Sequence, residues 1–299
     1  MTEPLQVRSG GVLPVDKPVG PTSHAIVARA RRALGTRKIG HSGTLDPFAS
    51  GLLLLCVDAA TRLSEYLTGL DKSYRTTMRL GQRTDTLDPE GEIVEEDEAW
   101  KALDAKRVQE TLAGFVGEIQ QVPPQYSAKK IGGEAMHRKA RRGERVELEP
   151  VTRRIEAMEL LEVDLPRVRF RIRCSSGTYV RALARDLGKA LGSCAHLLEL
   201  RRTGIGDFRV EDAVSLDDLD DPESVRRSWI SPRDALAHLP SVRVGESEAR
   251  RLAQGRRVTC PVEGTSNGVP VAVEWNGVLV AVGERRGAEL EPRKVFVRV

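Results

Sequence analysis

An aspartate, a tyrosine and an arginine in this chain have surroundings that could support chemistry. Asp46 lies in GHSGTLDPFASGLLLL (residues 40–55), between a glycine-rich turn and an apolar run, with Pro47 directly after it. Aspartate before proline fits a helix N-cap followed by the first helical position, and it also fits an ionised carboxylate that acts in catalysis. Tyr74 lies in KSYRTTMRLG, and Arg181 lies in CSSGTYVRALARDLG. Each residue alone is compatible with a structural role.

Other kinds of catalytic site lack their sequence patterns. The chain has no Walker or GxGxxG loop, no HExxH motif and no carboxylate pair close to Asp46 in sequence. The five histidines and four cysteines show no ligand spacing, so we expect no bound metal and no disulfide framework. The N-terminus has no signal pattern, and the apolar run LLLLCV is too short to span a bilayer. We therefore expect a cytoplasmic protein with no membrane contact.

Periodicity indicates which elements position the three residues. Helical patterns cover residues 22–35, 59–67, 105–117 and 178–192. Strand patterns cover residues 11–18, 52–57, 72–81, 153–177 (two strands about a turn at Pro166) and the region near 196–206. Tyr74 is thus expected on a strand and Arg181 on a helix.

The order of these elements predicts an α+β fold around a largely antiparallel sheet, because strands and helices are interleaved irregularly. From Leu239 onward the pattern changes to short strands with an Asn276-Gly277 turn. We therefore predict a catalytic domain over residues 1–238 and a small β-rich domain over residues 239–299.

Charge is segregated along the chain, although the formal net charge is only +4. Residues 124–154 hold nine Lys and Arg against four Asp and Glu, and residues 165–210 hold ten against three. Residues 85–105 hold nine acids against one lysine, and residues 211–223 hold seven acids and no base. This pattern is typical of a protein that binds a polyanion on its basic face and repels it from its acidic face. It is also compatible with a charged surface that is only solvated.

Four motifs together resemble one family. GHSGTLDPFASGLLLL, KSYRTTMRLGQRTDTLDPEG, PPQYSAKKIGG and CSSGTYVRALARDLGKALG with LRRTGIGDF are similar, in order and spacing, to motifs of the TruB-type tRNA pseudouridine synthases. The resemblance covers roughly residues 11–210. It implies a mixed, mainly antiparallel bisected sheet with flanking helices, an RNA-gripping insertion at about 124–154, and a PUA-like C-terminal domain. His137 is a departure, because many relatives carry tyrosine there.

The resemblance implies that the T-loop uridine at position 55 of tRNA is flipped out and isomerised to pseudouridine. No group is oxidised or lost, so no cofactor is expected. Asp46 is the implied nucleophile, and it attacks C1′, attacks C6 or removes a C2′ proton; the sequence leaves these pathways open. Arg181 is implied to keep this carboxylate charged. Tyr74 is implied to stack under the base and to take part in removal of the C5 proton.

Six further residues are implied to contact the substrate. His41 would fill space beside the flipped base, and Tyr179 and Leu200 would line the pocket. Lys17, Lys129 and Lys130 would grip the RNA. The expected partner is tRNA, bound through its T stem-loop, with no obligate protein partner and a monomeric enzyme.

Two alternatives use the same basic face. The first is a non-catalytic RNA-binding or tRNA-folding module, and the second is a guide-RNA-dependent relative inside a ribonucleoprotein. The intact set Asp46, Tyr74 and Arg181 favours an enzyme, because binding alone needs no buried carboxylate facing phosphates. The short C-terminal domain and the lack of long basic tails favour a stand-alone enzyme.

The basic insertion gives a first prediction. If its side chains bind phosphates, neutralising several of them weakens tRNA binding and flattens its salt dependence by about one unit of slope for each phosphate that is no longer neutralised. The residues to neutralise are Lys129, Lys130, Arg138, Lys139, Arg141 and Arg142. Binding isotherms over a salt series measure both effects, with Lys101 and Lys106 neutralised as the control. An unchanged affinity and slope would mean that this segment is merely solvated.

Overall fold

The large sheet of the protein has two halves, seen in the computed structural model, which describes residues 5–125, 130–131, 134–135, 148–259 and 266–298. The first half consists of β15 (Val214–Ser215), β2 (Gly10–Lys17), β4 (Ser50–Asp58) and β3 (Ile39–His41). The second half consists of β13 (Ala195–Ile205), β5 (Lys72–Leu80), β12 (Arg167–Cys174), β11 (Val151–Asp164) and β8 (Gly117–Gln121), with β14 (Phe208–Arg209) added to β13.

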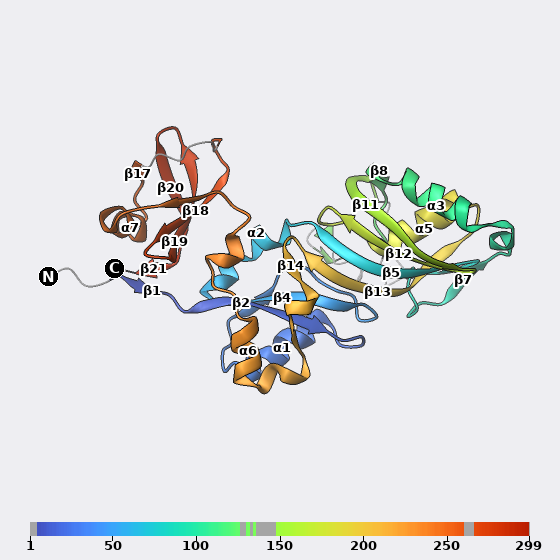
Figure 1. Cartoon of the computed structure of the whole chain (residues 1–299), viewed down its shortest axis with the longest axis horizontal. Coiled ribbons are helices and arrows are strands. Elements are labelled where there is room, and N and C mark those ends of the chain that lie inside the picture. Colours follow the sequence, from blue (N-terminus) through green and yellow to red (C-terminus); the bar gives the residue numbers. More distant parts are fainter. Residues whose placement is uncertain (1–4, 126–129, 132–133, 136–147, 260–265, 299) are drawn as a thin grey trace.

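The two halves meet at one crossing, where β4 and β13 pair in parallel at only two positions, Ser50 with Arg201 and Gly51 with Arg202. β15 also pairs with β2 in parallel, whereas the other pairs of this sheet are antiparallel. The sheet is therefore mainly antiparallel and divided in its middle (Figure 1). This arrangement confirms the predicted α+β class and the bisected sheet.

Strand β4 is apolar from Leu52 to Val57 because both of its faces are covered. Leu53 and Leu55 pack against helix α1 (Ser23–Ala33). Leu52 and Leu54 pack against η1 (Ala59–Leu63) and α2 (Ser64–Thr68). A strand buried on both faces has no polar alternation. The single helix predicted over residues 59–67 is a 3₁₀ turn followed by a short α-helix. Thr22 caps α1, and its hydroxyl accepts from the Ala25 amide at 3.1 Å.

The second half-sheet carries a core on one face only. Met78 of β5 and Phe170 of β12 pack with α3 (Ala105–Gly114) and α5 (Val180–Ala190). The opposite face of β12 is exposed and carries arginines that pair with acids of β11, as Arg169 does with Glu162 at 2.6 Å. This one-sided burial explains the alternation of apolar residues and arginines in β12.

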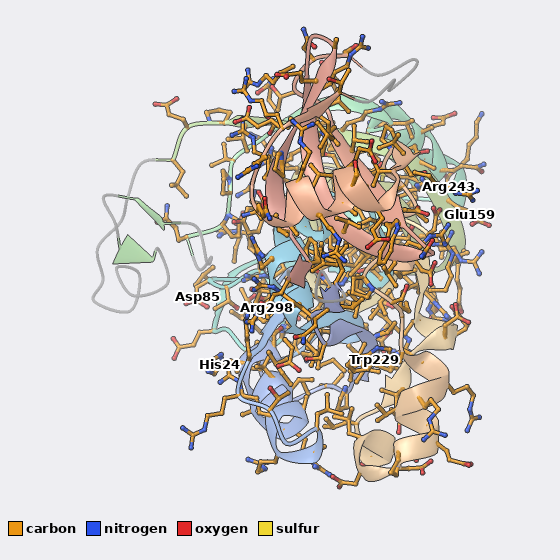
Figure 2. All side chains as sticks on the ribbon, turned by 90° about the vertical axis from the view of Figure 1, so that its left-hand side faces the viewer. His24, Asp85, Glu159, Trp229, Arg243 and Arg298 are labelled. Atoms are coloured by element: carbon orange, nitrogen blue, oxygen red, sulfur yellow. The ribbon has the colours of Figure 1, made fainter. Side chains whose placement is uncertain are left out.

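A second sheet begins at Ser241, close to the predicted boundary. Its strands are β16 (Ser241–Arg243), β18 (Pro270–Trp275), β19 (Val278–Arg286), β20 (Glu289–Val295) and β17 (Val258–Thr259), and α7 (Glu246–Ala253) packs on them. The predicted turn joins β18 to β19, with Asn276 at φ 48° and Gly277 at φ 77°. Figure 2 views the molecule from the end that carries this sheet, with Arg243 and Arg298 labelled.

The C-terminal sheet is not independent of the rest of the chain. Its Ala272, Leu279 and Phe296 belong to the same buried cluster as Leu52 and Leu63. Strand β1 (Gln6–Val7) pairs with β21 (Val297–Arg298), so the first described residues join the C-terminal end of the chain. The predicted division at residue 238 assigned them to the other domain.

The remaining described strands and α-helices are short. They are β6 (Gln82–Thr84), β7 (Ile93–Glu96), β9 (Lys130–Ile131), β10 (Glu134–Ala135) and α6 (Pro222–Ser228). Within the described part of the chain, no helix has the length and apolar character needed to cross a membrane.

Gly51 allows the two half-sheets to meet. It has φ +104°, and a Cβ at this position would lie 2.2 Å from the carbonyl oxygen and 2.7 Å from the amide nitrogen of Arg202. Both of these atoms belong to the backbone, which cannot rotate away. The crossing of β4 and β13 therefore requires glycine here.

Replacement of this glycine gives a prediction about folding. Gly51→Ala lowers the free energy of unfolding through backbone strain, worth about 1–3 kcal/mol, and through overpacking at the crossing, worth about 1–3 kcal/mol more. Gly20→Ala is the matched control, because Gly20 has φ +109° but an added Cβ has no heavy atom within 4 Å. Chemical denaturation measures both variants. Equal losses would show that the strands can separate to admit a methyl group.

Candidate active site

Asp46 lies in the loop between β3 and β4. Its carbonyl oxygen accepts from the Ala49 amide at 3.1 Å, which closes a four-residue turn with Pro47 at the second position. The chain enters β4 at Ser50, so no helix begins here. The N-cap interpretation of Asp46 is therefore wrong: proline suits the second position of a tight turn as well as it suits a first helical turn.

Lys17 supports this turn from behind. Its side chain is 0% exposed. Its ammonium group donates to the carbonyl oxygens of Ala49 at 2.6 Å, Pro18 at 2.9 Å and Pro47 at 3.3 Å. Burial lowers the pKa of Lys17 to about 8, while Asp46 acts in the opposite direction. The predicted grip of Lys17 on RNA does not fit this position, because all three donors of the buried ammonium are used within the loop.

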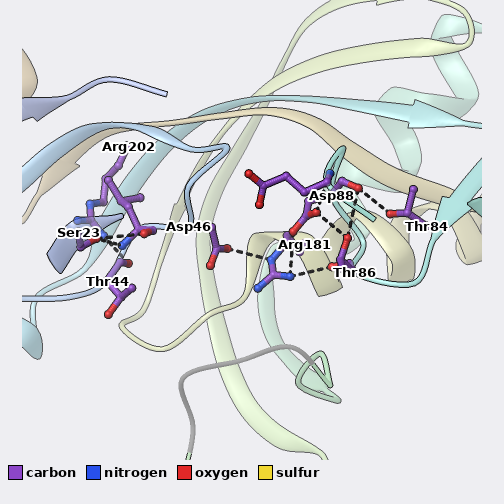
Figure 3. A network of polar contacts seen from close by, with 10 residues as sticks. Ser23, Thr44, Asp46, Thr84, Thr86, Asp88, Arg181 and Arg202 are labelled. Atoms are coloured by element: carbon purple, nitrogen blue, oxygen red, sulfur yellow. Dashed lines mark hydrogen bonds and ion pairs between the residues drawn. The ribbon is translucent and has the colours of Figure 1, made fainter. Parts of the chain in front are cut away.

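Arg181 stands between two carboxylates (Figure 3). Its Nε lies 2.9 Å from an Asp46 oxygen, and its Nη1 lies 3.1 Å from an Asp88 oxygen and donates to the Thr86 carbonyl at 2.7 Å. Arg181 is buried at the start of α5, and the Asp88 side chain is also buried, whereas 37% of the Asp46 side chain is exposed. The guanidinium plane thus fixes the direction in which the more accessible carboxylate points.

Asp88 is a residue of this candidate site that the sequence analysis missed. It lies in the loop between β6 and β7, where it accepts from the Thr86 hydroxyl at 2.6 Å and the Glu90 amide at 3.1 Å. A signal for it was present, because the tetrapeptide Thr-Leu-Asp-Pro occurs twice, at residues 44–47 and 86–89. Only the folded chain shows that one arginine binds the aspartate of each copy.

The electrostatics of Asp46 depend on this arrangement. Burial raises the pKa of Asp46 above its usual value, and the negative charge of Asp88 raises it further. Arg181 and, to a smaller degree, Lys17 favour the ionised form and lower the pKa. The net direction is upward. Ionisation of Asp46 is therefore unfavourable in this environment, and the contact with Arg181 stabilises the ionised carboxylate.

A pocket of about 270 Å³ opens beside these groups. Tyr74 of β5 forms part of its wall, with the strand fixed between β12 and β13. Burial raises the pKa of the Tyr74 hydroxyl, and the neighbouring Arg202 opposes this. The lining residues are Gly43, Thr44, Leu45, Asp46, Thr68, Lys72, Tyr74, Gly177, Thr178, Tyr179, Val180, Arg181 and Leu200.

The structure brings together five of the nine residues proposed from the sequence: Asp46, Tyr74, Tyr179, Arg181 and Leu200. Tyr179 is held at the start of α5, where its amide donates to the Gln121 side chain at 2.9 Å and its carbonyl accepts from it at 3.1 Å.

The other four proposed residues lie elsewhere. Lys17 is buried behind the turn, and His41, on β3, is not among the residues that line the pocket. Burial lowers the pKa of His41. Lys129 and the unusual His137 lie outside the described residues, and for Lys130 only the backbone, in β9, is described.

Two buried cations near the pocket were also missed. Arg202 of β13 is 1% exposed, and Lys72 of β5 donates to the carbonyl oxygens of Thr68 and Leu70. Burial, followed by the charge of Arg202, lowers the pKa of Lys72 to about 8. Both residues lie in motifs that the sequence analysis identified, but the sequence does not show whether a lysine or arginine of a strand is buried. Among the described residues, no group of three or more His, Cys, Asp and Glu side chains could hold a metal ion.

Comparison with family models decides the relationship of this chain. Residues 31–180 match the TruB family pseudouridylate synthase N-terminal domain, and residues 181–237 match the tRNA pseudouridylate synthase B C-terminal domain. The chain belongs to the TruB family of pseudouridylate synthases. Asp46 and Tyr74 fall within the first TruB model, and Arg181 is the first residue of the second.

TruB proteins of two bacteria are similar over nearly the whole chain. The tRNA pseudouridine synthase B of Burkholderia lata is 46% identical over 293 residues, which cover 96% of this chain and 90% of that protein. The tRNA pseudouridine synthase B of Thiobacillus denitrificans is 42% identical over 299 residues, which cover 99% of both.

Solved structures share the fold of this TruB family chain. A chain of an H/ACA ribonucleoprotein bound to a substrate RNA containing 2′-deoxyuridine is 29% identical, with a TM-score of 0.75, over 96% of this chain and 84% of that one. A chain of a Cbf5–Nop10–Gar1 complex is 28% identical, with a TM-score of 0.77, over 100% of this chain and 95% of that one. The bisected sheet is thus a pseudouridine synthase fold.

The arginine shared by two carboxylates gives a prediction about pH. Turnover that needs ionised Asp46 falls as the pH drops through the pKa of Asp46, which lies above the usual aspartate value of about 3.9. Asp88→Asn removes a negative charge near Asp46, so the acidic limb of the pH–rate profile moves to lower pH. It also loosens Arg181, so turnover at neutral pH falls by about 10- to 100-fold.

The control for this variant is Asp85→Asn, which changes an exposed aspartate of the same loop. Asn at this position can still accept from the Glu92 amide, as Asp85 does at 3.0 Å. Both pH profiles are measured under single-turnover conditions. An acidic limb that stays in place, or moves to higher pH, in Asp88→Asn contradicts the assigned electrostatics.

Proposed function

We propose that this TruB family protein isomerises the uridine at position 55, in the T loop of tRNA, to pseudouridine, with Asp46 as the nucleophile. One observation carries the proposal: Arg181 holds the Asp46 carboxylate at 2.9 Å at the edge of the pocket that Tyr74 lines. The choice of tRNA is supported by relatives that bear the name tRNA pseudouridine synthase B. The choice of position 55 rests on the four TruB-type motifs.

The reaction sets the requirements that the site has to meet. The bond between N1 and C1′ breaks, the uracil turns, and C5 bonds to C1′. C5 then loses its proton and N1 gains one. No electron is exchanged with an outside group, and atoms are conserved between substrate and product. Charged and aromatic side chains therefore suffice, and the proposed reaction uses no metal and no organic cofactor.

Asp46 supplies the reactive group. Its carboxylate attacks C1′, attacks C6 or removes the C2′ proton, and the ionised form serves all three pathways. Burial disfavours this form, and Arg181 restores it through a charge-assisted contact. Because Nη1 of Arg181 also contacts Asp88 at 3.1 Å, the guanidinium cannot rotate away from the reacting position without losing a second partner.

The base must leave its stack to reach Asp46. The pocket has a volume of about 270 Å³ and is lined by Tyr74 of β5 and Leu200 of β13, which suits a single base and not a helical stack. Enzymes that act on bases flip their target into such a pocket. Tyr74 offers an aromatic plane for stacking there, and Leu200 and Val180 add apolar wall.

Basic side chains support an RNA partner outside the pocket. Arg153, Arg62 and Lys294 line a separate open hollow, which shares Thr68 and Gly177 with the pocket wall. Lys294 pairs with Glu65 of the same hollow at 3.0 Å, so Arg62 and Arg153 supply its net positive charge next to the pocket wall. We propose the T stem-loop as the bound element, a PUA-like role for the C-terminal sheet, and a monomer that needs no protein partner.

A non-catalytic RNA-binding module is the second candidate. A surface that only binds phosphates gains nothing from Asp46 and Asp88 on one arginine, because two carboxylates repel phosphate and neutralise the cation. The geometry of the pocket therefore favours turnover over binding alone.

The test is isomerisation of an unmodified tRNA transcript whose uracils carry tritium at C5. We expect tritium release by the purified protein at the T-loop uridine and at no other position. Release at another position would refute the assigned target, and binding without release would favour the RNA-binding module.

A single substitution tests the role of Asp46. Asp46→Asn keeps the shape of the side chain but removes the charged oxygen, so turnover falls below detection. The melting temperature and tRNA affinity stay near wild type, because Asp88 and the Thr86 carbonyl still bind the buried Arg181 guanidinium in this variant. Tritium release, thermal melting and filter binding are measured in parallel.

Asp104→Asn is the matched control for this substitution. Asp104 caps helix α3 by accepting from the Arg107 amide at 2.7 Å, and asparagine caps a helix about as well as aspartate. This control keeps full turnover. Near-normal turnover of a folded Asp46→Asn variant would exclude Asp46 as the nucleophile.

A further inference from the structure

Arg202 is the largest side chain that the structure buries completely. It lies on β13 where the half-sheets cross. Its Nε donates to the Leu52 carbonyl at 2.7 Å, its Nη2 to the Gly43 carbonyl at 3.2 Å, and its Nη1 to the Thr44 carbonyl at 3.4 Å. Within the described ranges no carboxylate forms an ion pair with it. A cation without an anion is expensive to bury, so packing alone does not account for an arginine here.

The residue opposite Arg202 across the β5–β13 ladder is Tyr74. Opposed side chains of an antiparallel pair lie on the same face of the sheet. Arg202 therefore faces Tyr74 directly across the ladder, and its positive charge acts on the Tyr74 hydroxyl. Of the five N–H groups of a guanidinium, the three carbonyl contacts use three, so two remain for this hydroxyl oxygen.

The other groups around Tyr74 do not favour its ionised form. Burial raises the pKa of Tyr74 most strongly, and Asp46 from the loop and Cys174 from β12 raise it further. Burial raises the pKa of Cys174 to about 12, so this thiol is neutral. Lys72 and Arg181 line the same pocket, on β5 and α5. The charge that directly opposes the burial of Tyr74 is that of Arg202.

We infer that Arg202 is a positioning residue of the isomerisation: it ties the loop that carries Asp46 to the strand that carries Tyr74, and it stabilises the phenolate of Tyr74 as the acceptor of the C5 proton. The inference rests on the proposed function. Gly43 and Thr44 belong to the Asp46 loop, so one buried cation holds both catalytic groups in register. The positive charge of Arg202 stabilises a phenolate in this buried position, as hydration stabilises a phenolate on the surface.

The step that Arg202 serves follows the bonding of C5 to C1′. The hydroxyl proton of Tyr74 has passed to water. The C5–H bond breaks, the proton bonds to the phenolate oxygen, and the electron pair restores the C5–C6 double bond. The displaced electrons go to N1, or to the Asp46 oxygen where this is bonded to C6. N1 carries a proton taken from water in the product, and no oxidant or reductant takes part.

The first experiment measures the ionisation of Tyr74 itself. The four tyrosines are replaced biosynthetically by 3-fluorotyrosine, whose phenol ionises at lower pH, and ¹⁹F NMR follows each resonance. Tyr74→Phe identifies the resonance of Tyr74 by its loss. We expect Arg202→Gln to raise the pKa of Tyr74 by about one unit or more. The control Arg201→Gln removes the charge of the neighbouring arginine, which pairs with Asp16 at 2.7 Å, and changes the pKa of Tyr74 by less than about half a unit.

The second experiment measures tritium release by the same two variants. Since a tenfold lower phenolate fraction follows each unit of pKa, release by Arg202→Gln at neutral pH falls about tenfold or more and recovers as the pH rises. Arg201→Gln stays within about threefold of wild type over the same range. Filter binding of tRNA is unchanged in both variants.

The outcomes separate the inference from other failures. If both variants lose activity equally while folded, or if Tyr74 titrates alike in both, Arg202 acts only as packing and the inference is overturned. If the wild type releases no tritium, the proposed function fails, while NMR still tests the link to Tyr74. In case Arg202→Gln does not fold, the wild-type Nε–H resonance of Arg202 must follow the Tyr74 titration, and a resonance that ignores it overturns the inference.

Discussion

The contact on which the site depends is the binding of two carboxylates by the single guanidinium of Arg181. A lone aspartate in a partly closed pocket would take up a proton, because burial disfavours its charge. A lone arginine with the exposure of Arg181 would be equally unfavourable. The second carboxylate, Asp88, fixes the cation, and the fixed cation keeps Asp46 ionised and oriented. Asp88 also raises the pKa of Asp46, so the arrangement trades some ionisation for position.

Much of the remaining framework follows from the need to hold loops still. Three buried cations, Lys17, Lys72 and Arg202, donate to backbone carbonyls of the loops and strand ends around the pocket. Each satisfies acceptors that would otherwise be buried without partners, and each requires the removal of a charge from water, which is unfavourable. Burial lowers the pKa of both lysines to about 8, which reflects this cost. These cations hold the loops in place, as backbone hydrogen bonds hold the strands in place.

The bisected sheet supplies the geometry for this. Strands β4 and β13 contact each other at only two paired positions, and their separation elsewhere leaves room for a pocket between the half-sheets. Asp46 comes from the loop before β4, Tyr74 from β5, and Arg181 from the helix packed on the second half. Chains of the H/ACA ribonucleoprotein and of the Cbf5–Nop10–Gar1 complex share this frame, although each differs from this chain in more than two thirds of the aligned residues.

The sequence by itself determined the elements and the identities of the central residues. Periodicity located β4, β5 and α5, because the spacing of apolar residues along an element depends on which of its faces is buried. The motifs around Asp46, Tyr74 and Arg181 indicated the family. Tertiary structure alone decided the turn at Asp46, the burial of Lys17 and the partnership of Asp88 with Arg181. These depend on contacts between residues far apart in the chain, and local pattern carries no information on such distances. The local sequence around a strand lysine is the same whether its ammonium group reaches water or donates to three carbonyl oxygens.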